Sequence, residues 1–298
     1  MIMRTQLLAC MAVAAATALG QGLDTVRILN QYAVTPNITY LTANNYESKL
    51  DVYRRRGIET PLPTVVVIHG GGWVGGTKEA TSLWVLPYLE AGFNVVNVEY
   101  RLARVSLAPA AVEDCRCALR WVARNAKQYG FDPAKLILTG GSAGGHLALI
   151  TGMIPESAGL DRYCEGGPEP KAAAIVNWYG ITDVADLLDG QNKKGYAVTW
   201  LGWQSDRVEI AKRVSPMTYV RAGLPAVLTI HGDADPTVPY AHGVALTKAL
   251  KAAGVQAELF TVPGGKHGGF SLAESLKVYQ AIGGFLGGLG LTPPPLAK

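Results

Sequence analysis

The chain has 298 residues, of which 49% are hydrophobic and 17% are charged, and its formal net charge at pH 7 is +4. A chain of this length can bury a large core, and although length alone allows two domains, one α/β domain of this size is common. Lysine and arginine (27) barely outnumber aspartate and glutamate (23), so the charge gives no reason to expect a nucleic-acid partner.

The first twenty residues have the pattern of a secretory signal peptide. Arg4 supplies a positive charge, residues 7–19 form an alanine-rich apolar run, and small residues precede a predicted cleavage site before Gln21. The apolar run is shorter than the roughly 20 residues that a membrane-spanning helix requires. We therefore predict a periplasmic or secreted protein with no membrane span after cleavage, whose mature chain, residues 21–298, forms a single domain.

Three cysteines, Cys115, Cys117 and Cys164, remain after the predicted cleavage. Their spacing lacks the paired C-x-x-C pattern of a metal site. Cys115 and Cys117 lie two residues apart on a predicted helix, so their side chains point in different directions and cannot bridge each other. An oxidising compartment permits one disulfide from this helix to Cys164, and the sequence leaves open which of the two cysteines forms it.

Apolar strands and helices alternate along the chain. Two strands near the start, at 38–41 and 49–53, are predicted to form an antiparallel pair. Further strands are predicted at 64–69, 94–99, 136–139, 172–179, 226–231 and 257–262, and helices at 109–129, 240–253 and 274–286. Continuous apolar strands that alternate with helices are typical of a mostly parallel sheet covered by helices on both faces. The predicted fold class is therefore α/β.

A glycine-bounded serine separates the strand at 136–139 from an apolar segment that is predicted to begin a helix. Ser142 lies in the sequence Gly-Gly-Ser-Ala-Gly-Gly, which contains a G-x-S-x-G motif. Between a strand and a helix this motif is typical of a nucleophile elbow, a sharp turn that exposes a reactive serine. Gly140 and Gly144 are expected to avoid side chains that would collide with the strand or the helix.

Three consecutive glycines, residues 70–72, follow the strand at 64–69 and precede Trp73. Glycines have no side chain to pack, but such a loop can turn backbone N–H groups towards one point in space, as in an oxyanion hole. We expect the amides of Gly71 and Gly72, together with that of Ala143, to form this hole. The alternative, an ordinary flexible turn, is disfavoured by the pairing with a nucleophile elbow.

A serine hydroxyl needs a base to accept its proton, and the chain has five histidines. His267 is the predicted base, because it lies in a glycine-rich loop after the last strand that can reach over the sheet to the serine. His69 is interpreted as structural, since it lies on the strand side of the glycine loop. His242 is expected at the surface.

The acid that orients the base is expected between the serine and the histidine in the chain. Asp235 is the preferred candidate, because it stands just beyond a strand end and Pro236 fixes the following turn. Asp233 is interpreted as a cap for the amides of its own loop. Asp183, after the preceding strand, is retained as a third candidate.

Together these motifs resemble an α/β-hydrolase esterase of the bacterial feruloyl and acetyl esterase group, near the hormone-sensitive-lipase-like carboxylesterases. The likeness extends from about residue 40 to residue 286 and rests on residues 69–73, residues 100–103, Pro109 with Asp114, the elbow, Asp235 and His267. Gly141 is a departure, because many relatives carry histidine before the serine. The lack of a long amino-terminal cap disfavours large lipid substrates.

The resemblance also places a short helical insertion, about residues 181–224, over the active site. This segment contains Tyr196, Trp200 and Trp203, which are therefore candidates, with Trp73, for the wall of a substrate pocket. The alternative is that the aromatic residues of the insertion pack it onto the body of the protein and that Trp73 holds the glycine loop.

The activity that the resemblance implies is hydrolysis of small acyl esters, acetyl or feruloyl, on plant-derived carbohydrate, through Ser142, His267 and Asp235 and without a metal or organic cofactor. A prolyl-oligopeptidase-like peptidase is an alternative, although the mature chain has no room for the accessory propeller. A kynurenine-formamidase-like amidohydrolase is another, which a signal peptide fits poorly. An inactive binding protein on the same fold would be expected to lack a triad residue, and all three positions are filled.

Overall fold

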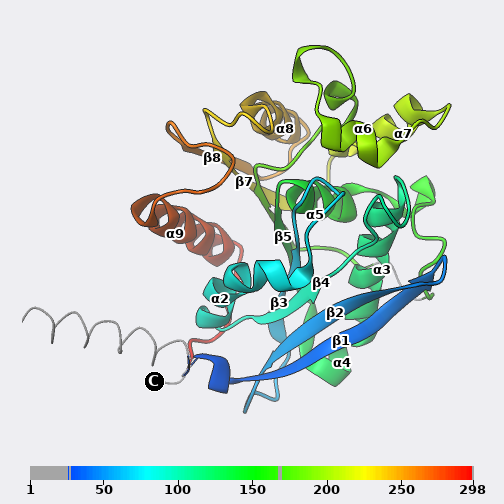
Figure 1. Cartoon of the computed structure of the whole chain (residues 1–298). Helices are drawn as coiled ribbons and strands as arrows, with labels where there is room; N and C mark the ends of the chain where they lie inside the picture. Colours follow the sequence, from blue (N-terminus) through cyan, green and yellow to red (C-terminus); the bar gives the residue numbers. More distant parts are fainter. Residues whose placement is uncertain (1–25, 27, 167–169, 297–298) are drawn as a thin grey trace, which may run out of the picture.

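The computed structural model describes residue 26, residues 28–166 and residues 170–296 (Figure 1). The predicted signal peptide, residues 1–20, lies outside the described residues. Within them, eight strands form one sheet in the order β1-β2-β4-β3-β5-β6-β7-β8. The strands are β1 Tyr32–Ala43, β2 Tyr46–Arg55, β3 Leu62–Ile68, β4 Asn94–Val98, β5 Phe131–Gly141, β6 Ala174–Trp178, β7 Ala226–Gly232 and β8 Ala257–Val262.

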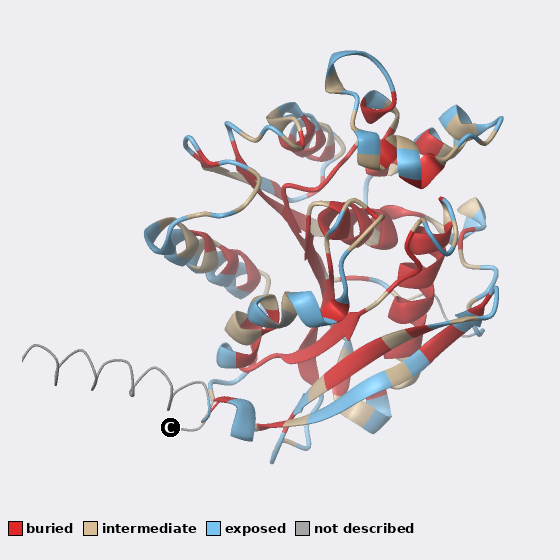
Figure 2. Ribbon diagram, in the orientation of Figure 1, coloured by how far each residue is buried: buried red, intermediate tan, exposed pale blue. Residues whose placement is uncertain are grey.

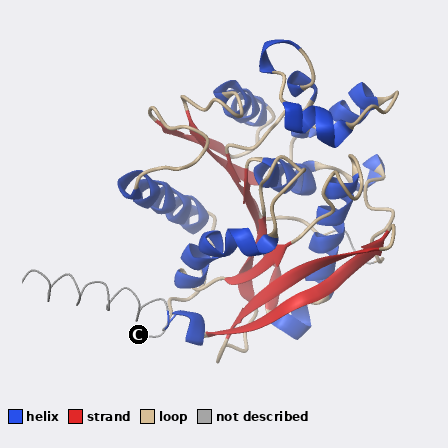
Figure 3. Cartoon of the chain, in the orientation of Figure 1, coloured by secondary structure: helices blue, strands red, loops and turns tan. Residues whose placement is uncertain are grey.

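The sheet is antiparallel only at its first edge. β1 pairs with β2 and β2 pairs with β4 in antiparallel register, whereas the five remaining neighbour pairs are parallel. Both the opening antiparallel pair and the mostly parallel sheet are thus confirmed (Figure 3). Because the strands from β3 to β8 run in one direction, the loops that follow them meet at the same edge of the sheet.

Helices cover both faces of the sheet (Figure 1). They are α2 Ser82–Glu90, α3 Ala110–Arg124, α4 Ala126–Tyr129, α5 Ala143–Met153, α6 Gly195–Leu201, α7 Arg207–Arg213, α8 Tyr240–Ala252 and α9 Leu272–Gly288, with short 3-10 helices at Lys78–Thr81, Glu156–Ala158, Ala185–Leu187, Gly190–Asn192 and Pro216–Tyr219. Among the described residues, no helix combines the length and the apolar character needed to cross a bilayer.

Alternating side chains of the central strands supply a hydrophobic core on each face. On β3, Val65 and Val67 join a core with α2 and α9, whereas Val66 and Ile68 join a larger core with α3, α5 and α8. Figure 2 shows the middle of the sheet and α5 as buried, with exposed residues on the outer surface of α9. The two cores fix the sheet edge from which the functional loops project.

The structure corrects the predicted elements at two places. The helix predicted over 109–129 is divided into α3 and α4 at Asn125, where the side chain Nδ2 donates to Trp121 O at 2.8 Å and so competes for the helical backbone. The helix α2 is not among the predicted elements. It contains Pro87, a residue that usually interrupts helices.

A disulfide joins Cys117 of α3 to Cys164. Cys115 is a buried thiol in the larger core, because its position on α3 points towards the sheet rather than towards Cys164. The disulfide therefore resolves the alternative that the sequence left open. It ties α3 to the loop that follows α5 and the 3-10 helix Glu156–Ala158.

Trp73 at the end of the glycine loop is buried against α5 and α6. Its ring stacks on Trp200 with the centroids 4.1 Å apart, and its Nε1 donates to His146 Nδ1 at 3.1 Å. His146 in turn donates from Nε2 to Val214 O at 2.7 Å. Three segments distant in sequence, the glycine loop, α5 and the segment between β6 and β7, are thus held together by one buried imidazole.

Stability should depend on pH through His146. Burial lowers the pKa of His146 to about 4, whereas a histidine in the unfolded chain titrates near about 6.5. Between these two values the unfolded chain binds a proton that the folded protein does not, so stability decreases as the pH falls through this window. For this group alone we expect a loss of about 2 kcal/mol in the free energy of unfolding between pH 7 and pH 5.

Urea unfolding at pH 7 and pH 5 measures this loss in the wild type and in His146→Gln, whose amide is uncharged at both values. The variant is expected to be less stable at pH 7 but to lose about 2 kcal/mol less than the wild type on acidification. An equal loss in both proteins would contradict the assignment.

Candidate active site

Ser142 forms the turn between β5 and α5. Its backbone angles are φ 58° and ψ −121°, a positive-φ conformation that residues other than glycine rarely adopt. The Ser142 N–H donates to Trp178 O at 2.9 Å, and Ser142 O accepts from the N–H of His146 at 2.9 Å. Strand, strained serine and helix therefore follow one another as the motif predicts.

The two flanking glycines are required by the close approach of β3. A Cβ at Gly140 would lie 2.4 Å from Ile68 O, and a Cβ at Gly144 would lie 2.1 Å from the same atom. The Cβ at Gly140 would also meet Gly144 O at 2.6 Å. The expected collision between strand and helix is therefore present, but the nearest obstacle is the last carbonyl of the neighbouring strand.

The glycine loop after β3 adopts a backbone that side chains would obstruct. Gly71 has φ 112° and Gly72 has φ 60°, and a Cβ at Gly71 would lie 2.0 Å from Gly75 O. Within the described part of the chain, the amides of Gly71, Gly72 and Ala143 donate no hydrogen bond. Three backbone donors are thus available beside Ser142.

His267 and Asp235 form a hydrogen-bonded pair. His267 Nδ1 lies 2.8 Å from Asp235 Oδ2, and because a carboxylate accepts, Nδ1 carries the proton and Nε2 is free to accept one. The other carboxylate oxygen, Oδ1, accepts from the amides of Thr237 at 2.7 Å and Val238 at 3.0 Å. The side chain of Asp235 is fully buried, whereas that of His267 is 20% exposed.

A second histidine contacts the same carboxylate. His231, at the end of β7, is fully buried and its Nε2 lies 3.2 Å from both Asp235 Oδ2 and Val238 O. Burial alone would raise the pKa of Asp235, but hydrogen bonds from His231, His267 and two backbone amides outweigh it and hold that pKa well below the usual range. Asp235 is therefore ionised at neutral pH.

The other candidate acids are occupied elsewhere. Asp233 Oδ1 accepts from the amide of Gly264 at 2.6 Å, so it caps the loop after β8 rather than its own loop as predicted. Asp183 Oδ1 accepts from the amide of Ala185 at 3.0 Å, at the start of a 3-10 helix. Neither carboxylate pairs with a histidine.

Two further histidines have structural partners. His69 donates from Nδ1 to Gly70 O at 2.7 Å and stacks on Tyr100 with the ring centroids 4.2 Å apart, in line with its structural interpretation. His242 was expected at the surface, but it is buried, because it accepts from the amide of Thr182 and pairs through Nε2 with Asp186. It ties α8 to the segment between β6 and β7.

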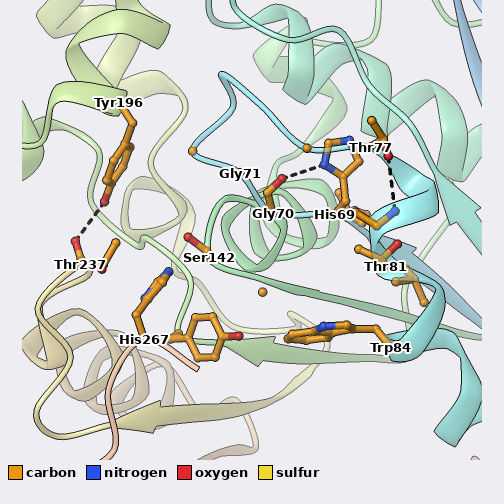
Figure 4. Close-up of a pocket in the computed structure, with 17 residues that line it drawn as sticks. His69, Gly70, Gly71, Thr77, Thr81, Trp84, Ser142, Tyr196, Thr237 and His267 are labelled. Atoms are coloured by element: carbon orange, nitrogen blue, oxygen red, sulfur yellow. Dashed lines mark hydrogen bonds between the residues drawn. The ribbon is translucent and has the colours of Figure 1, made fainter. Parts of the chain in front are cut away.

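Ser142 and His267 line one cavity of about 470 Å³ at the carboxyl edge of the sheet. Figure 4 shows His267, Tyr196 and Thr237 on one side of Ser142 and His69, Thr77, Thr81 and Trp84 on the other. The cavity is lined by residues 67–72, 76, 77, 80, 81, 84, 141, 142, 179, 196, 237 and 267. The predicted nucleophile, base and glycine loop therefore border one space.

The segment between β6 and β7 extends across this cavity to the loop after β7 that carries Asp235, here called the acid loop. Tyr196 donates from its hydroxyl to Thr237 O at 3.1 Å, and Lys194 Nζ donates to Pro236 O at 2.9 Å. The Tyr196 side chain also packs on the glycine loop, since a Cβ at Gly72 would lie 2.9 Å from Tyr196 Cβ. Tyr196 thus forms one end wall of the cavity.

The three tryptophans predicted to line the pocket lie elsewhere. Trp73 and Trp200 are fully buried in their mutual stack, and Trp203 is 87% exposed on the surface, beside Arg207. None of them is among the residues that line the cavity. The pocket assignment is therefore wrong, and the alternative interpretation of Trp73 and Trp200 as packing residues is correct.

Of the aromatic residues that line the cavity, Tyr196 was among the candidates of the insertion, but sequence reasoning missed Trp84 and Tyr179. Trp84 comes from α2, and Tyr179 follows the last residue of β6. Tyr179 could have been found, because ligands of parallel sheets bind beyond the carboxyl ends of the strands and Tyr179 stands at such an end. Nothing in the sequence around Trp84 indicates a binding role.

Several known proteins similar to this chain are esterases. The chain is 29% identical over 253 residues to esterase LipQ of Mycobacterium tuberculosis, covering 81% of this chain and 59% of that protein. It thus spans about three fifths of the length of the first curated relatives that it matches.

Solved structures of esterases share the fold over nearly their full length. Thermogutta terrifontis esterase 2, phosphoramylated by tabun, superposes with a TM-score of 0.75 and 28% identity, covering 89% of this chain and 97% of that one. A truncated carbohydrate esterase from gut microbiota gives a TM-score of 0.73 with 27% identity, over 87% and 97% of the two chains. Other structures of the Thermogutta esterase contain propionate or butyrate.

These neighbours establish an α/β-hydrolase fold, in agreement with the strand order and the strand–serine–helix turn described above. The family model described as BD-FAE matches residues 50–250. Because that match covers more than half of the chain, the protein belongs to the BD-FAE family of α/β-hydrolases.

Proposed function

We propose that this protein is a serine carboxylesterase that hydrolyses small acyl esters. The observation that carries the proposal is the placement of Ser142 on a strained turn, in one cavity with His267, whose Nδ1 is bound to the buried carboxylate of Asp235. The esterase names of its relatives and structural neighbours support the reaction class.

In the proposed reaction, Ser142 Oγ attacks the ester carbonyl carbon while its proton passes to His267 Nε2. The carbonyl oxygen becomes an oxyanion that accepts hydrogen bonds from the amides of Gly71, Gly72 and Ala143, and each such donor is typically worth about 2.7–4 kcal/mol. His267 then gives its proton to the departing alcohol, which leaves an acyl-serine. Water repeats the sequence, releases the acid and restores Ser142.

Asp235 supports the charge that His267 acquires in both half-reactions. Because the carboxylate is ionised and accepts from Nδ1, it holds the imidazole in the tautomer whose Nε2 can accept the serine proton. The contact with His231 and the two backbone amides fixes the carboxylate in turn. The acid is therefore rigid before substrate binds.

The proposed substrates are acetyl or feruloyl esters, on carbohydrate. A cavity of about 470 Å³ is large enough for a small acyl group together with part of its alcohol. The bound propionate and butyrate of the Thermogutta esterase support a short acyl group, and the carbohydrate esterase among the structural neighbours supports a sugar alcohol.

Ser142→Ala is expected to abolish hydrolysis of nitrophenyl acetate, with kcat lower by about 10⁴-fold or more, because the variant lacks the hydroxyl on which the acyl intermediate forms. The wild-type protein is then assayed on nitrophenyl esters of increasing acyl length, which measures the preferred acyl length. Assays on acetylated xylan and methyl ferulate compare the proposed acetyl and feruloyl substrates. Equal activity of the variant, or an inactive wild type, would remove the esterase proposal and favour a binding protein. Preferential cleavage of peptide or formamide bonds would favour the peptidase or amidohydrolase alternatives.

Asp235 and Asp233 provide a matched pair for testing the acid. Asp235→Asn should lower kcat by about 10³–10⁴-fold, since the amide cannot stabilise the imidazolium. Asp233→Asn, two residues away, should change kcat less than about threefold, because its carboxylate only caps the loop at Gly264. Comparable losses in the two variants would show that the assignment of Asp235 is mistaken.

We also propose that the protein is exported. The charged, apolar and small-residue pattern of residues 1–20 supports a cleaved signal peptide. The Cys117–Cys164 disulfide supports an oxidising compartment, where such bonds persist. Amino-terminal sequencing of the protein from a periplasmic or culture fraction is expected to begin at Gln21, and recovery of uncleaved protein from the cytoplasm alone would argue against export.

A further inference from the structure

Tyr179, which follows β6, is held in a backbone conformation that aromatic residues avoid. Its φ is 40°, in the left-handed region, and its amide donates to Ile230 O at 2.7 Å. A strained non-glycine residue persists only where its surroundings over-determine it, and such residues cluster at functional sites. The Tyr179 ring packs against the core with α2 and α9 and also lines the active-site cavity.

Three aromatic rings surround the ring of Tyr179. The centroid of His267 lies 4.6 Å away, that of Phe270 lies 6.1 Å away and that of Trp84 lies 6.5 Å away. The residue is only 7% exposed, although it lines the cavity. The phenol is therefore rigid, and its position is set before any ligand arrives.

Two glycines, one next to the serine and one next to the base in the sequence, leave room for the Tyr179 hydroxyl. A Cβ at Gly141 would lie 3.2 Å from the hydroxyl oxygen, and a Cβ at Gly268 would lie 2.8 Å from it. Gly141 has no left-handed φ, so it is the space and not the backbone that excludes a side chain there. Gly141, which precedes Ser142, and Gly268, which follows His267, therefore both lie against the hydroxyl oxygen of Tyr179.

The Tyr179 hydroxyl differs from those of the other buried tyrosines in the described residues. Tyr32, Tyr40, Tyr88 and Tyr100 are also buried, and the hydroxyl of each is hydrogen-bonded to another residue. Within the same part of the chain, the Tyr179 hydroxyl has no such partner. Burial, and secondarily the charge of Asp235, raise the pKa of Tyr179, so the phenol stays protonated and can donate.

We propose that Tyr179 binds the acyl half of the substrate by donating a hydrogen bond to an oxygen atom of the acyl chain. The proposal rests on the proposed esterase function. His267 must protonate the departing alcohol, so the alcohol lies on the side of Ser142 where Figure 4 shows His267, Tyr196 and Thr237. The acyl chain then extends to the opposite side, towards Trp84.

The Tyr179 hydroxyl lies on this acyl side. A Cβ at Gly141 would lie 3.2 Å from the Tyr179 hydroxyl and 2.8 Å from the Trp84 ring, so the side chains of Tyr179 and Trp84 meet beside Gly141. An all-carbon acyl chain that reaches the hydroxyl would displace water from it and supply no hydrogen-bond acceptor in its place. A chain with an ether, hydroxyl or carbonyl oxygen near the ester would replace the lost hydrogen bond, and a site of this kind discriminates against the analogue that lacks it.

Two nitrophenyl esters of equal size test the proposal. Butyryl and methoxyacetyl groups have the same number of heavy atoms, but in methoxyacetyl an ether oxygen replaces one methylene. The quantity to measure is the ratio of kcat/KM for methoxyacetate to that for butyrate, in the wild type and in Tyr179→Phe. Because the intrinsic reactivity of each ester cancels between the two proteins, the change in this ratio reports the hydroxyl alone.

We expect the ratio to fall about tenfold in Tyr179→Phe, with kcat/KM for butyrate within about twofold of the wild-type value. Tyr279→Phe is the matched control, since Tyr279 is a half-buried phenol that lies outside this cavity, and it should leave the ratio unchanged. Thermal unfolding confirms that both variants are folded.

An unchanged ratio in Tyr179→Phe would overturn the proposal. If kcat/KM also falls equally on both esters, the hydroxyl acts on the ester group itself and not on the acyl chain. A wild type that hydrolyses neither ester would instead defeat the esterase function on which the proposal rests. The two failures are thus distinguished within one experiment.

Discussion

The site depends on one close approach, that of the β5–α5 turn to the end of β3. Ser142 can point into the cavity only because its backbone adopts a positive φ with a ψ of −121°, a sparsely populated conformation that costs about 1–3 kcal/mol. Hydrogen bonds to Trp178 and His146 hold this conformation, and the glycines on either side let the turn lie against Ile68 O. The last residue of β3 is also where the glycine loop begins, so the same contact sets serine and loop beside each other.

The parallel sheet brings the remaining groups to this point. The glycine loop follows β3, Tyr179 follows β6, Asp235 follows β7 and His267 follows β8, and each lies just beyond the carboxyl end of its strand. Register between parallel strands therefore fixes the spacing of groups that are far apart in sequence. The buried Trp73–His146–Trp200 cluster performs the same task for the segment between β6 and β7.

The contrast between Asp235 and Asp233 illustrates how the acid loop works. Both carboxylates accept backbone amides, but only Asp235 also faces two histidines, because the proline-bearing turn directs it back over the end of β7. A carboxylate that is buried and yet ionised needs this many donors. Rigidity of the acid loop follows from the same hydrogen bonds that keep the acid charged.

The motifs that the sequence predicted are those defined by local chemistry. Ser142 could be predicted because an elbow requires glycines at fixed offsets, and Asp235 and His267 because chain order and strand ends restrict the choice. The cavity wall could not be predicted in the same way. Trp200 and Trp203 lie three residues apart, and packing against Trp73 buries one while the other stays in solvent. Trp84 enters from a helix that has no distinguishing motif, and only the tertiary fold brings it to Gly141.

Whether Cys115 or Cys117 bonds to Cys164 likewise depends on the direction in which each side chain of α3 points. Cys115 faces the sheet and Cys117 faces the loop that carries Cys164, and this rotation is set by the packing of α3 on the strands. The apolar stripe of Val112, Cys115, Leu119 and Val122 predicts that Cys115 lies on the buried face of the helix, and the structure agrees. The sequence does not show where Cys164 lies relative to that face.

The mass of the covalent adduct formed with an organophosphate tests most directly whether Ser142 is the nucleophile. Wild-type protein treated with diisopropyl fluorophosphate should gain one phosphoryl group, located by peptide mass spectrometry on the peptide that contains Ser142, and Ser142→Ala should gain none. An adduct on any other residue, or an unmodified Ser142 in protein that still hydrolyses esters, would contradict the account.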